Sequence, residues 1–516
     1  VNHLRGMFAI AIWDEKKNRI ILVRDRLGVK PLYYHIKNHK LLFASELKVL
    51  LEHHEINPTI NRNAISDYLT YLYVPAPETI FNEIKKLRPA EMLVFNLDGN
   101  FFTKRYWNVE FQNSNQDEGD YAKQLRNLLE ESIDLRMVSD VPVGILLSSG
   151  IDSSLVATLA TKKSDDKLNT YTVGFEDITD SSYDELKESR DMANILGTDH
   201  HEIIVNSNDA FKLLDKVSWY LDEPFGNPTT TLNYIISEFA SRTSKVVLSG
   251  VGGDEMFGGY PKYKALKIFE DFEKFPKSFV KKFGTVFQKI PDKTSESVVK
   301  GKIFFDSWKD EPEDQYFSLV SYFKENDKQK LLNFKALPSR RFLDELFLES
   351  KKCNASSFFE RLFFVENMSY LPNNILEYTD KTSMAVSLEV REPLLDHKMA
   401  EFAANIPFSL KIKNGSMKYI LKLAMKDDLP KTVLNRKKRG FTPPLINWLN
   451  NSLSDLESKY LSKKKIDEKK LINYEYVKKI SEDYKKGKTS NYAKIWSLIC
   501  LESWFESFFK KYNIQV

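Results

Sequence analysis

A chain of 516 residues is longer than a single hydrophobic core ordinarily supports, so roughly two to four domains are expected. Its 76 Lys and Arg nearly balance its 72 Asp and Glu, and the net charge of +4 argues against a nucleic-acid surface as its main activity. Cys353 and Cys500 cannot form a disulfide framework, and no Cys or His spacing indicates zinc, so we expect a cytoplasmic protein. No run of about 18 residues is apolar, so we expect no membrane span.

The N-terminal part of the chain predicts a β-rich layer with a short helix. The expected strands form two pairs, Met7–Trp13 with Arg19–Arg24 across the turn Asp14–Asn18, and Glu91–Phe95 with Phe101–Tyr106 across Asp98–Asn100. The stretch from Asn108 to Asp120 is polar and acidic and has no periodicity. We place the domain boundary there, with residues 108–119 as the linker.

From Tyr121 the pattern changes to alternating helices and buried strands. The expected strands are Val143–Leu147, Thr170–Phe175, Glu202–Val205 and Lys245–Ser249. The expected helices are Tyr121–Met137, Ser153–Lys163, Asp184–Leu196, Asp209–Tyr220 and Thr230–Arg242. Such alternation predicts a parallel sheet with helices on both faces, which binds ligands beyond the carboxyl ends of its strands.

The remaining chain is expected to be largely helical. Residues Lys262–Lys352 are rich in Lys, Glu and Phe at helical spacing, carry no chemical motif and predict a helical insertion. Asn354–Leu376 and Lys398–Met425 also look helical. For the basic and aromatic tail, Asn450–Val516, we favour an amphipathic helix docked on the body over a membrane or partner anchor.

One stretch, VPVGILLSSGIDSS at Val141–Ser154, carries the first chemical signal. A tight Ser/Gly loop between a strand and a helix directs N–H groups, hydroxyls and the positive end of the helix dipole at one point, which suits a phosphate. Asp152 would repel that phosphate without a divalent cation, so we interpret the loop as a Mg-nucleotide site. The string resembles the S-G-G-x-D-S loop of ATP pyrophosphatases, with Ser149 in the place of a usual glycine. The alternative is a plain Ser/Gly turn.

A second loop, SGVGGDEMFGGY at Ser249–Tyr260, also follows a buried strand. Its glycines let the backbone approach a ligand closely, and it places Asp254 and Glu255 at the sheet edge that bears Asp152. Two aspartates from neighbouring strand ends can hold Mg²⁺ against pyrophosphate. The alternative interpretation is a glycine hinge with solvated acids.

Five motifs in order closely resemble the synthetase domain of glutamine-hydrolysing asparagine synthetases of the bacterial B type. They are LLSSGIDSS, TVGF, LSGVGGDEMFGGYPKY, DKTSMAVSLEVREPLLD and RKKRGFTPP. The earlier strings GMFAIAIWDEKKNRIILVRDRLGVKPLYYH and FASELKVL resemble the second half of that family's glutaminase domain. The resemblance implies an α/β synthetase domain of the ATP-pyrophosphatase type at residues 120–516. A partial α+β glutaminase domain of the N-terminal-nucleophile type at residues 1–107 would precede it.

The same resemblance implies roles for individual residues. The adenosine part of ATP would contact Leu147, Val173, Ser249 and Gly250, and the pyrophosphate with Mg²⁺ would lie on Ser148, Ser149, Gly150, Asp152 and Ser153. Lys438 and Lys418 match catalytic cations on the phosphate side. Asp152 and Asp254, the aspartates of the two glycine loops, are the expected metal-binding and catalytic carboxylates. Preorganised cations stabilise the negative charge that adenylation concentrates. For each lysine, the alternative is a solvated surface position.

The stretch Asp380–Asp396 mixes charges into an apolar segment, and buried charges need partners. It therefore forms an internal ion-pair network or lines a polar pocket. The resemblance places it beside the acceptor site, so the expected pocket residues are Asp380, Ser383, Glu389 and Arg391, with Arg391 the candidate for pairing a substrate carboxylate.

Two departures qualify the resemblance. Val251 stands where these synthetases usually carry a glutamate, which leaves open a different acceptor. The family's glutaminase nucleophile is an N-terminal cysteine, and no cysteine precedes Cys353, so this chain holds no such nucleophile. Because Val1 leads directly into recognisable pattern, we expect truncation rather than evolved loss.

The hypothesis is ATP- and Mg²⁺-dependent amidation of aspartate through β-aspartyl-AMP, with ammonia derived from glutamine in a complete protein. Its substrates are small molecules, with no nucleic-acid or membrane partner, and the oligomeric state stays open, a homodimer being one option. Three alternatives remain: an amidotransferase acting on another carboxylate, a non-catalytic nucleotide-binding subunit and a tRNA-modifying enzyme. The last would need a cysteine pair and a basic face, and neither is evident.

Overall fold

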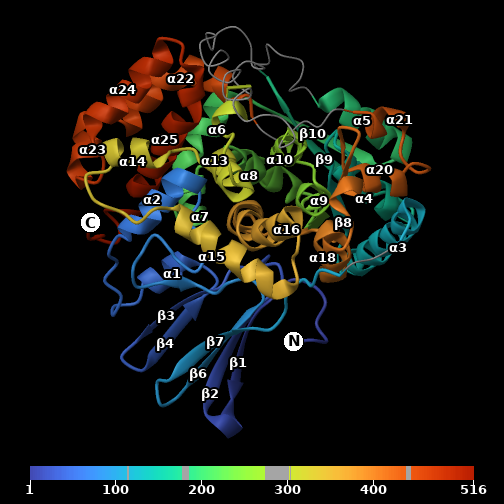
Figure 1. Ribbon diagram of the computed structural model, residues 1–516, viewed down its shortest axis with the longest axis horizontal. Coiled ribbons are helices and arrows are strands. Elements are labelled where there is room, and N and C mark those ends of the chain that lie inside the picture. Colours follow the sequence, from blue (N-terminus) through green and yellow to red (C-terminus); the bar gives the residue numbers. More distant parts are fainter. Residues whose placement is uncertain (113–115, 177–184, 273–300, 303, 437–442) are drawn as a thin grey trace.

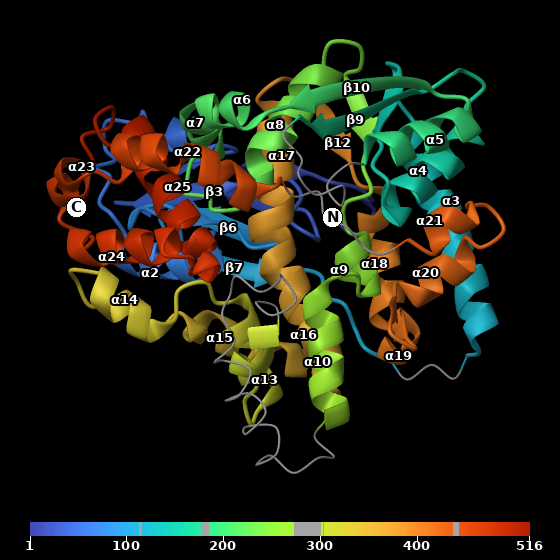
Figure 2. The ribbon, with the colours of Figure 1, turned by 90° about the horizontal axis from the view of Figure 1, so that it is seen from above.

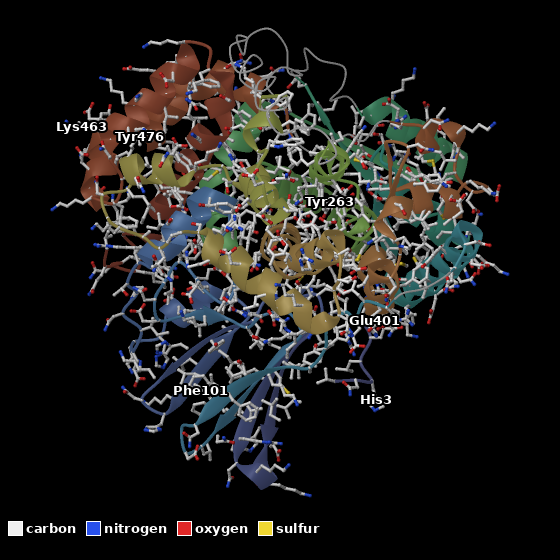
Figure 3. The ribbon with its side chains drawn as sticks, viewed as in Figure 1. His3, Phe101, Tyr263, Glu401, Lys463 and Tyr476 are labelled. Carbon is white, nitrogen blue, oxygen red and sulfur yellow. The ribbon has the colours of Figure 1, made fainter. Side chains whose placement is uncertain are left out.

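The structure is a computed structural model that describes residues 1–112, 116–176, 185–272, 301–302, 304–436 and 443–516 (Figure 1). Two small antiparallel sheets at the N-terminal end project below a large, mostly helical body (Figure 1). Figure 3 shows Phe101 on these sheets, away from the helices, whereas Tyr263 lies among them. No helix among the described residues is long and apolar enough to cross a bilayer.

The N-terminal sheets contain both predicted strand pairs. One sheet has the order β1-β2-β6-β7, and the other has the order β4-β3-β5. The elements are β1 (Ala9–Asp14), η1 (Glu15–Lys17), β2 (Arg19–Arg24), β3 (Tyr33–Lys37), β4 (Lys40–Ala44), α1 (Leu47–Leu51), α2 (Arg62–Tyr71), β5 (Lys85–Lys86), β6 (Glu91–Asn96) and β7 (Phe101–Arg105). The β6–β7 turn requires Gly99, since φ is +88° and a Cβ there would lie 1.8 Å from His39 Nδ1.

A five-stranded sheet with the order β10-β9-β8-β11-β12 forms the centre of the body, and every neighbouring pair is parallel, as predicted. Its strands are β8 (Val143–Leu146), β9 (Asn169–Phe175), β10 (Asp199–Val205), β11 (Val246–Leu248) and β12 (Glu389–Arg391). Helices α4 and α5 pack on one face and α8 with α17 on the other (Figure 2). The strand β12 was not predicted from the sequence.

The helices around this sheet follow the predicted order. They are α3 (Glu118–Met137), α4 (Ile151–Thr161), α5 (Leu186–Leu196), α6 (Ser207–Lys212), α7 (Leu214–Leu221), α8 (Thr229–Ala240) and α9 (Gly253–Phe257). The single helix expected at Asp209–Tyr220 is divided at Leu213 into α6 and α7. The predicted linker has a polar composition, yet two of its residues, Val109 and Phe111, are buried in the main core.

The described part of the predicted insertion is helical; its residues 273–300 and 303 lie outside the described ranges. The elements that follow α9 are α10 (Pro261–Phe272), α13 (Pro312–Val320), α14 (Glu325–Leu331), α15 (Arg340–Ser350), η4 (Lys351–Cys353), α16 (Phe358–Met368), the π-helix η5 (Leu371–Leu376), α17 (Glu377–Met384) and η6 (Pro393–Leu395). The π-helix leads directly into α17.

The prediction of a helix over Lys398–Met425 is wrong in the middle of that stretch. The chain forms α18 (His397–Ala404), α19 (Phe408–Lys411), the hairpin of β13 (Ile412–Lys413) with β14 (Ser416–Met417), and then α20 (Tyr419–Ala424). The turn residues Asn414 and Gly415 both have positive φ, 51° and 74°. An Asn-Gly pair favours such a hairpin turn, so the sequence held this signal.

The C-terminal tail is docked on the body, as predicted. Its elements are α21 (Lys431–Leu434), α22 (Leu445–Tyr460), α23 (Lys463–Lys469), α24 (Tyr474–Lys485), η7 (Thr489–Asn491) and α25 (Tyr492–Phe508). Figures 1 and 2 both show α25 beside α2, and the Tyr68 hydroxyl of α2 donates a 2.7 Å hydrogen bond to the carbonyl of Ser497. A second core cluster therefore combines residues from both ends of the chain.

Candidate active site

The loop between β8 and α4 is folded on its own serines. The Ser148 N–H donates to Ser153 Oγ at 3.0 Å, the Gly150 N–H donates to Ser148 Oγ at 3.2 Å, and Ser153 Oγ donates to the Ser148 carbonyl at 3.1 Å. Gly150 is the N-cap of α4, so the positive end of an eleven-residue helix lies at this loop. Leu147, which directly follows β8, and Val173, which lies within the adjacent strand β9, are both buried.

The second glycine loop lies directly against the first. A Cβ on Gly250 would lie 2.6 Å from the Ser153 nitrogen, and a Cβ on Gly253 would lie 2.2 Å from Asp152 Oδ1. The Ser249 N–H donates to the Arg391 carbonyl at 2.9 Å and so fixes the start of this loop to β12. The contact between the two loops therefore requires these glycines, whether or not a ligand also needs them.

A lysine and two aspartates meet at this contact. Lys418 Nζ forms an ion pair with Asp152 and lies 2.6 Å from Asp254 Oδ1. The Lys418 side chain is only 4% exposed. Burial alone would lower the pKa of this ammonium, but the charges of the two carboxylates outweigh it and raise the pKa above its usual range. The group is therefore a fixed positive charge at any physiological pH.

The residues present also fit a divalent cation. Asp152 Oδ1 is buried, and no described residue donates a hydrogen bond to it. Carboxylate oxygens are the preferred protein ligands of Mg²⁺, with phosphate oxygens and water completing the coordination. Asp152 and Asp254 share Lys418 as a partner, so both carboxylates face one point.

Lys438, the other predicted cation, lies outside the described residues. Arg436, two positions before it, donates from Nη1 to the Ser149 carbonyl at 3.0 Å and so reaches the phosphate loop. The Ser149 N–H donates to the Glu185 carboxylate at 3.3 Å. Sequence reasoning assigned no role to either residue, although Arg436 is the first residue of the RKKRGFTPP motif.

The predicted acceptor residues are engaged in contacts with other groups of the protein. Asp380 pairs with Lys30 at 2.5 Å, and the buried Ser383 hydroxyl donates to the Asp380 carbonyl at 3.1 Å. Arg391 Nε donates to Glu389 at 2.6 Å, and Arg391 Nη1 donates to the carbonyls of residues 136 and 138 at the end of α3. In the structure this stretch forms the ion-pair network that was one of the two alternatives, and an acceptor role for these residues stays a prediction.

That network continues across the junction with the N-terminal sheets. Lys381 Nζ lies 2.9 Å from Asp222 Oδ2 and donates to the Tyr33 hydroxyl at 2.7 Å. Burial alone would raise the pKa of Glu377, but Lys381 and Lys86 outweigh it and lower the pKa to about 2. No spacing in the sequence indicated these partners, because they come from segments far apart in the chain.

Comparison with known proteins gives two family matches. Residues 124–506 match the family model described as asparagine synthase, and residues 1–107 match the glutamine amidotransferase domain. Asparagine synthetase [glutamine-hydrolyzing] 1 of Bacillus subtilis is 32% identical over 97% of this chain and 77% of its own length. Asparagine synthetase [glutamine-hydrolyzing] 3 of the same organism is 30% identical over 91% and 74%. Amidase chry2 of Gibberella zeae is 26% identical over 89% and 73%.

Proposed function

This chain belongs to the asparagine synthase family of glutamine-hydrolysing ligases, and on that premise we propose that it makes asparagine from aspartate, ATP and ammonia. A side-chain carboxylate oxygen of aspartate attacks the α-phosphorus of ATP, and the bond to pyrophosphate breaks. Ammonia then attacks the acyl carbon of β-aspartyl-AMP, and AMP leaves. Activation replaces one difficult step by two easier ones, because a free carboxylate is a poor electrophile.

The observation that carries this proposal is the position of Lys418 between Asp152 and Asp254, where the two glycine loops touch. The phosphates would lie at the N-terminus of α4, on Ser148, Ser149, Gly150, Asp152 and Ser153. The adenosine part would lie beside Leu147, Val173, Ser249 and Gly250. Lys418 supplies positive charge in a buried place, where it costs no reorganisation as negative charge develops on the phosphates. Lys438 is proposed for the same role on the strength of its motif.

We include Mg²⁺ in the proposal, held by Asp152 and Asp254. The ion would neutralise the charge of the departing pyrophosphate. The buried Asp152 oxygen that lacks a described donor supports this assignment. Displacement of the Lys418 ammonium from one of the carboxylates would make room for the ion.

The proposed domains are residues 1–107 for the glutaminase part, 108–119 for the linker and 120–516 for the synthetase part. Glutamine is the proposed source of the ammonia, through the glutamine amidotransferase domain that residues 1–107 match. A cytoplasmic location fits ATP as substrate and two buried, unpaired cysteines. A homodimer is the proposed oligomeric state.

A different carboxylate acceptor is the second candidate, and Val251 favours it. The side chain of Val251 packs against the main core, and its N–H donates to Ser249 Oγ at 3.2 Å, so this position brings no carboxylate to the site. A sugar acid or a peptide carboxylate would be the alternative substrate. A relative named as an amidase supports the idea that acceptors differ among similar chains.

The test is pyrophosphate release from Mg-ATP and ammonium chloride, with and without L-aspartate. The purified chain is compared with Asp152→Asn, and the exposed Asp209→Asn on α6 serves as the matched control. We expect release that depends on aspartate, with equal formation of asparagine, lost in Asp152→Asn and kept in Asp209→Asn. Release that ignores aspartate but responds to another carboxylate would replace aspartate by that acceptor.

A further inference from the structure

The backbone of Ser149, in the loop between β8 and α4, is bound on both sides by charged side chains from outside that loop. Its N–H donates to Oε2 of Glu185 at 3.3 Å, and its carbonyl accepts from Nη1 of Arg436 at 3.0 Å. Ser149 is only 2% exposed, and a buried backbone group needs a hydrogen-bond partner. Glu185 therefore provides the acceptor for a buried N–H group of the loop.

The two charged residues come from elements that pack beside α4. Glu185 directly precedes α5 and Arg436 follows α21, and Figures 1 and 2 both show these helices next to α4. Arg436 Nη2 also lies 3.6 Å from Oε1 of Glu188, which is one turn further along α5. The start of α5 thus brings one carboxylate to the loop and another to the arginine that holds the loop.

Helix capping does not explain the position of the Glu185 carboxylate. Glu185 is the N-cap residue of α5, but no described residue of that helix donates a capping hydrogen bond to its side chain. An N-cap side chain that stabilises its own helix accepts such a bond. The hydrogen bond from the phosphate loop therefore accounts for this carboxylate better than α5 does.

The same N–H group is expected to bind phosphate. In the function proposed above, the pyrophosphate lies on this loop at the N-terminus of α4, where N–H groups suit anions. Carboxylate and phosphate oxygens are both anionic acceptors, and they make the same kind of hydrogen bond to an N–H group. Two such anions also repel each other at short range. Glu185 and a phosphate therefore compete for the Ser149 N–H.

The other groups that contact this loop do not oppose a phosphate. The N–H groups of Ser148 and Gly150 donate to the hydroxyls of Ser153 and Ser148. These acceptors are neutral, and a hydroxyl can rotate to donate to a phosphate oxygen. Arg436 is a cation, so its contact with the Ser149 carbonyl is compatible with a bound phosphate. The Glu185 carboxylate is the group that has to move.

We propose that Glu185 competes with the phosphates of ATP at this loop. Its carboxylate accepts from the Ser149 N–H in the empty site, gives way when ATP binds, and returns when pyrophosphate leaves. No covalent bond changes in this exchange. This inference rests on the function proposed above, and it adds a residue that sets how tightly the site binds ATP and pyrophosphate.

Such competition is useful in an enzyme that releases pyrophosphate. Contacts that bind substrate and product equally well do not lower the barrier of the chemical step, and they hold the product back. A carboxylate that returns to the N–H stabilises the empty site and so favours release. The apparent affinity for both ligands falls in proportion to the fraction of chains whose N–H is available.

The test measures binding without turnover. Mg-ATP and Mg-pyrophosphate are titrated separately into the purified chain by calorimetry, with no aspartate or ammonium present. For Glu185→Ala we expect dissociation constants at least about 5-fold lower for both ligands, because the N–H is then always available. Glu185→Gln preserves the size of the side chain and keeps a neutral acceptor, so its values should lie between those of Glu185→Ala and the unaltered chain.

Glu188→Ala is the matched control. Glu188 carries the same charge one turn away on the same helix, but its carboxylate pairs with Arg436 instead of the Ser149 N–H. We expect its dissociation constants to change by less than about 2-fold, because salt screens a partly exposed charge. In the assay of asparagine formation, the inhibition constant of pyrophosphate should fall in Glu185→Ala and stay unchanged in Glu188→Ala.

The outcomes separate the two proposals. Weaker or unchanged binding by both Glu185 variants would overturn this inference, and weaker binding would assign Glu185 to supporting the shape of the loop. An equal gain in Glu188→Ala would also overturn it, because loss of a nearby charge would then be sufficient. An unaltered chain that binds neither ATP nor pyrophosphate would overturn the proposed function, and this inference with it. Tighter binding by Glu185→Ala in a chain that makes no asparagine would support this inference and replace only the acceptor.

Discussion

The hydroxyl of Tyr33 donates a 2.6 Å hydrogen bond to the carboxylate of Glu377, across the junction between the N-terminal sheets and α17. The same hydroxyl accepts a hydrogen bond from Lys381, and all three groups are buried. Inside a protein such a fully satisfied polar network fixes a unique arrangement, because an unpaired member would be costly. The relative position of the two parts is thus set by specific polar contacts as well as by apolar packing.

Removal of this hydroxyl should lower stability. Tyr33→Phe leaves Glu377 and Lys381 each with one partner fewer, so we expect the free energy of unfolding to fall by about 1–3 kcal/mol. Urea unfolding measures the change. The neighbouring Tyr34→Phe is the control, because no described residue pairs with the Tyr34 hydroxyl; an equal loss in both variants would contradict the prediction.

Glu377 should stabilise the fold in a defined pH range. Its pKa of about 2 in the folded chain lies below the ordinary 4.5, because the favourable charges of Lys381 and Lys86 outweigh burial. Its contribution is therefore complete above about pH 4.5 and is lost as the pH falls through about 2. Glu377→Gln should cost on the order of 3 kcal/mol at neutral pH, and progressively less in acid. Denaturation midpoints of Glu377→Gln and of the unaltered chain, measured at several pH values, should approach each other as the pH falls.

Glu392 should show the opposite dependence. Its folded pKa of about 8 lies above the ordinary value, so the folded chain holds this proton more tightly than the unfolded chain. Stability is then lost as the pH rises from about 4.5 to about 8. Relative to the unaltered chain, Glu392→Gln should become more stable over that interval and then level off. A constant difference from acid to alkaline pH would refute this assignment.

Lys418 should be essential for adenylation and should compete with metal. Lys418→Met removes a buried cation from the phosphate site, so we expect aspartate-dependent pyrophosphate release to fall at least about 100-fold. The two carboxylates that remain should take up Mg²⁺ in its place, so that MgCl₂ raises the melting temperature more than in the unaltered chain. Lys422→Met is the control, since Lys422 donates to Ser416 instead.

The contact between the glycine loops should tolerate no side chain. A Cβ at position 253 would lie 2.2 Å from Asp152 Oδ1, so Gly253→Ala must shift that carboxylate. A displacement of about 1 Å in a catalytic group can cost about 100-fold in rate, and we expect a loss of that order. Gly119→Ala, in the exposed first turn of α3, should leave the rate unchanged. Near-normal release by Gly253→Ala would show that the loops separate freely.

Long, periodic elements could be predicted from the sequence, and short ones could not. The buried runs of β8, β9 and β11 and the helices between them had clear periodicity. The strand β12 has only three residues, Glu389–Arg391, and two of them are charged, so it exists because β11 offers a free edge for pairing. The hairpin at Asn414 had a local turn signal that the surrounding helical pattern concealed.

Part of the candidate active site could also be predicted from the sequence. The loops around Asp152 and Asp254 follow buried strands, so their meeting at one sheet edge was expected. The third member, Lys418, follows a hairpin and has a φ of 55°, and no spacing rule places it between two aspartates. The partners of Tyr33 and Lys30 depend on how two parts of the chain dock. Such pairs become visible only when the tertiary arrangement is known.

The burial of α25 against the N-terminal part has a consequence for synthesis on the ribosome. Trp504 of α25 donates from Nε1 to the carbonyl of Asp222 at 2.9 Å, and the same Asp222 accepts from the N–H of Leu47 in α1. Residues translated early thus wait for partners that emerge almost at the end of this sequence. Until then the apolar cluster that Leu47 shares with Trp504 lacks part of its packing. Premature termination before Trp504 would yield a chain that contains both glycine loops. Its N-terminal part would lack the packing that α25 provides.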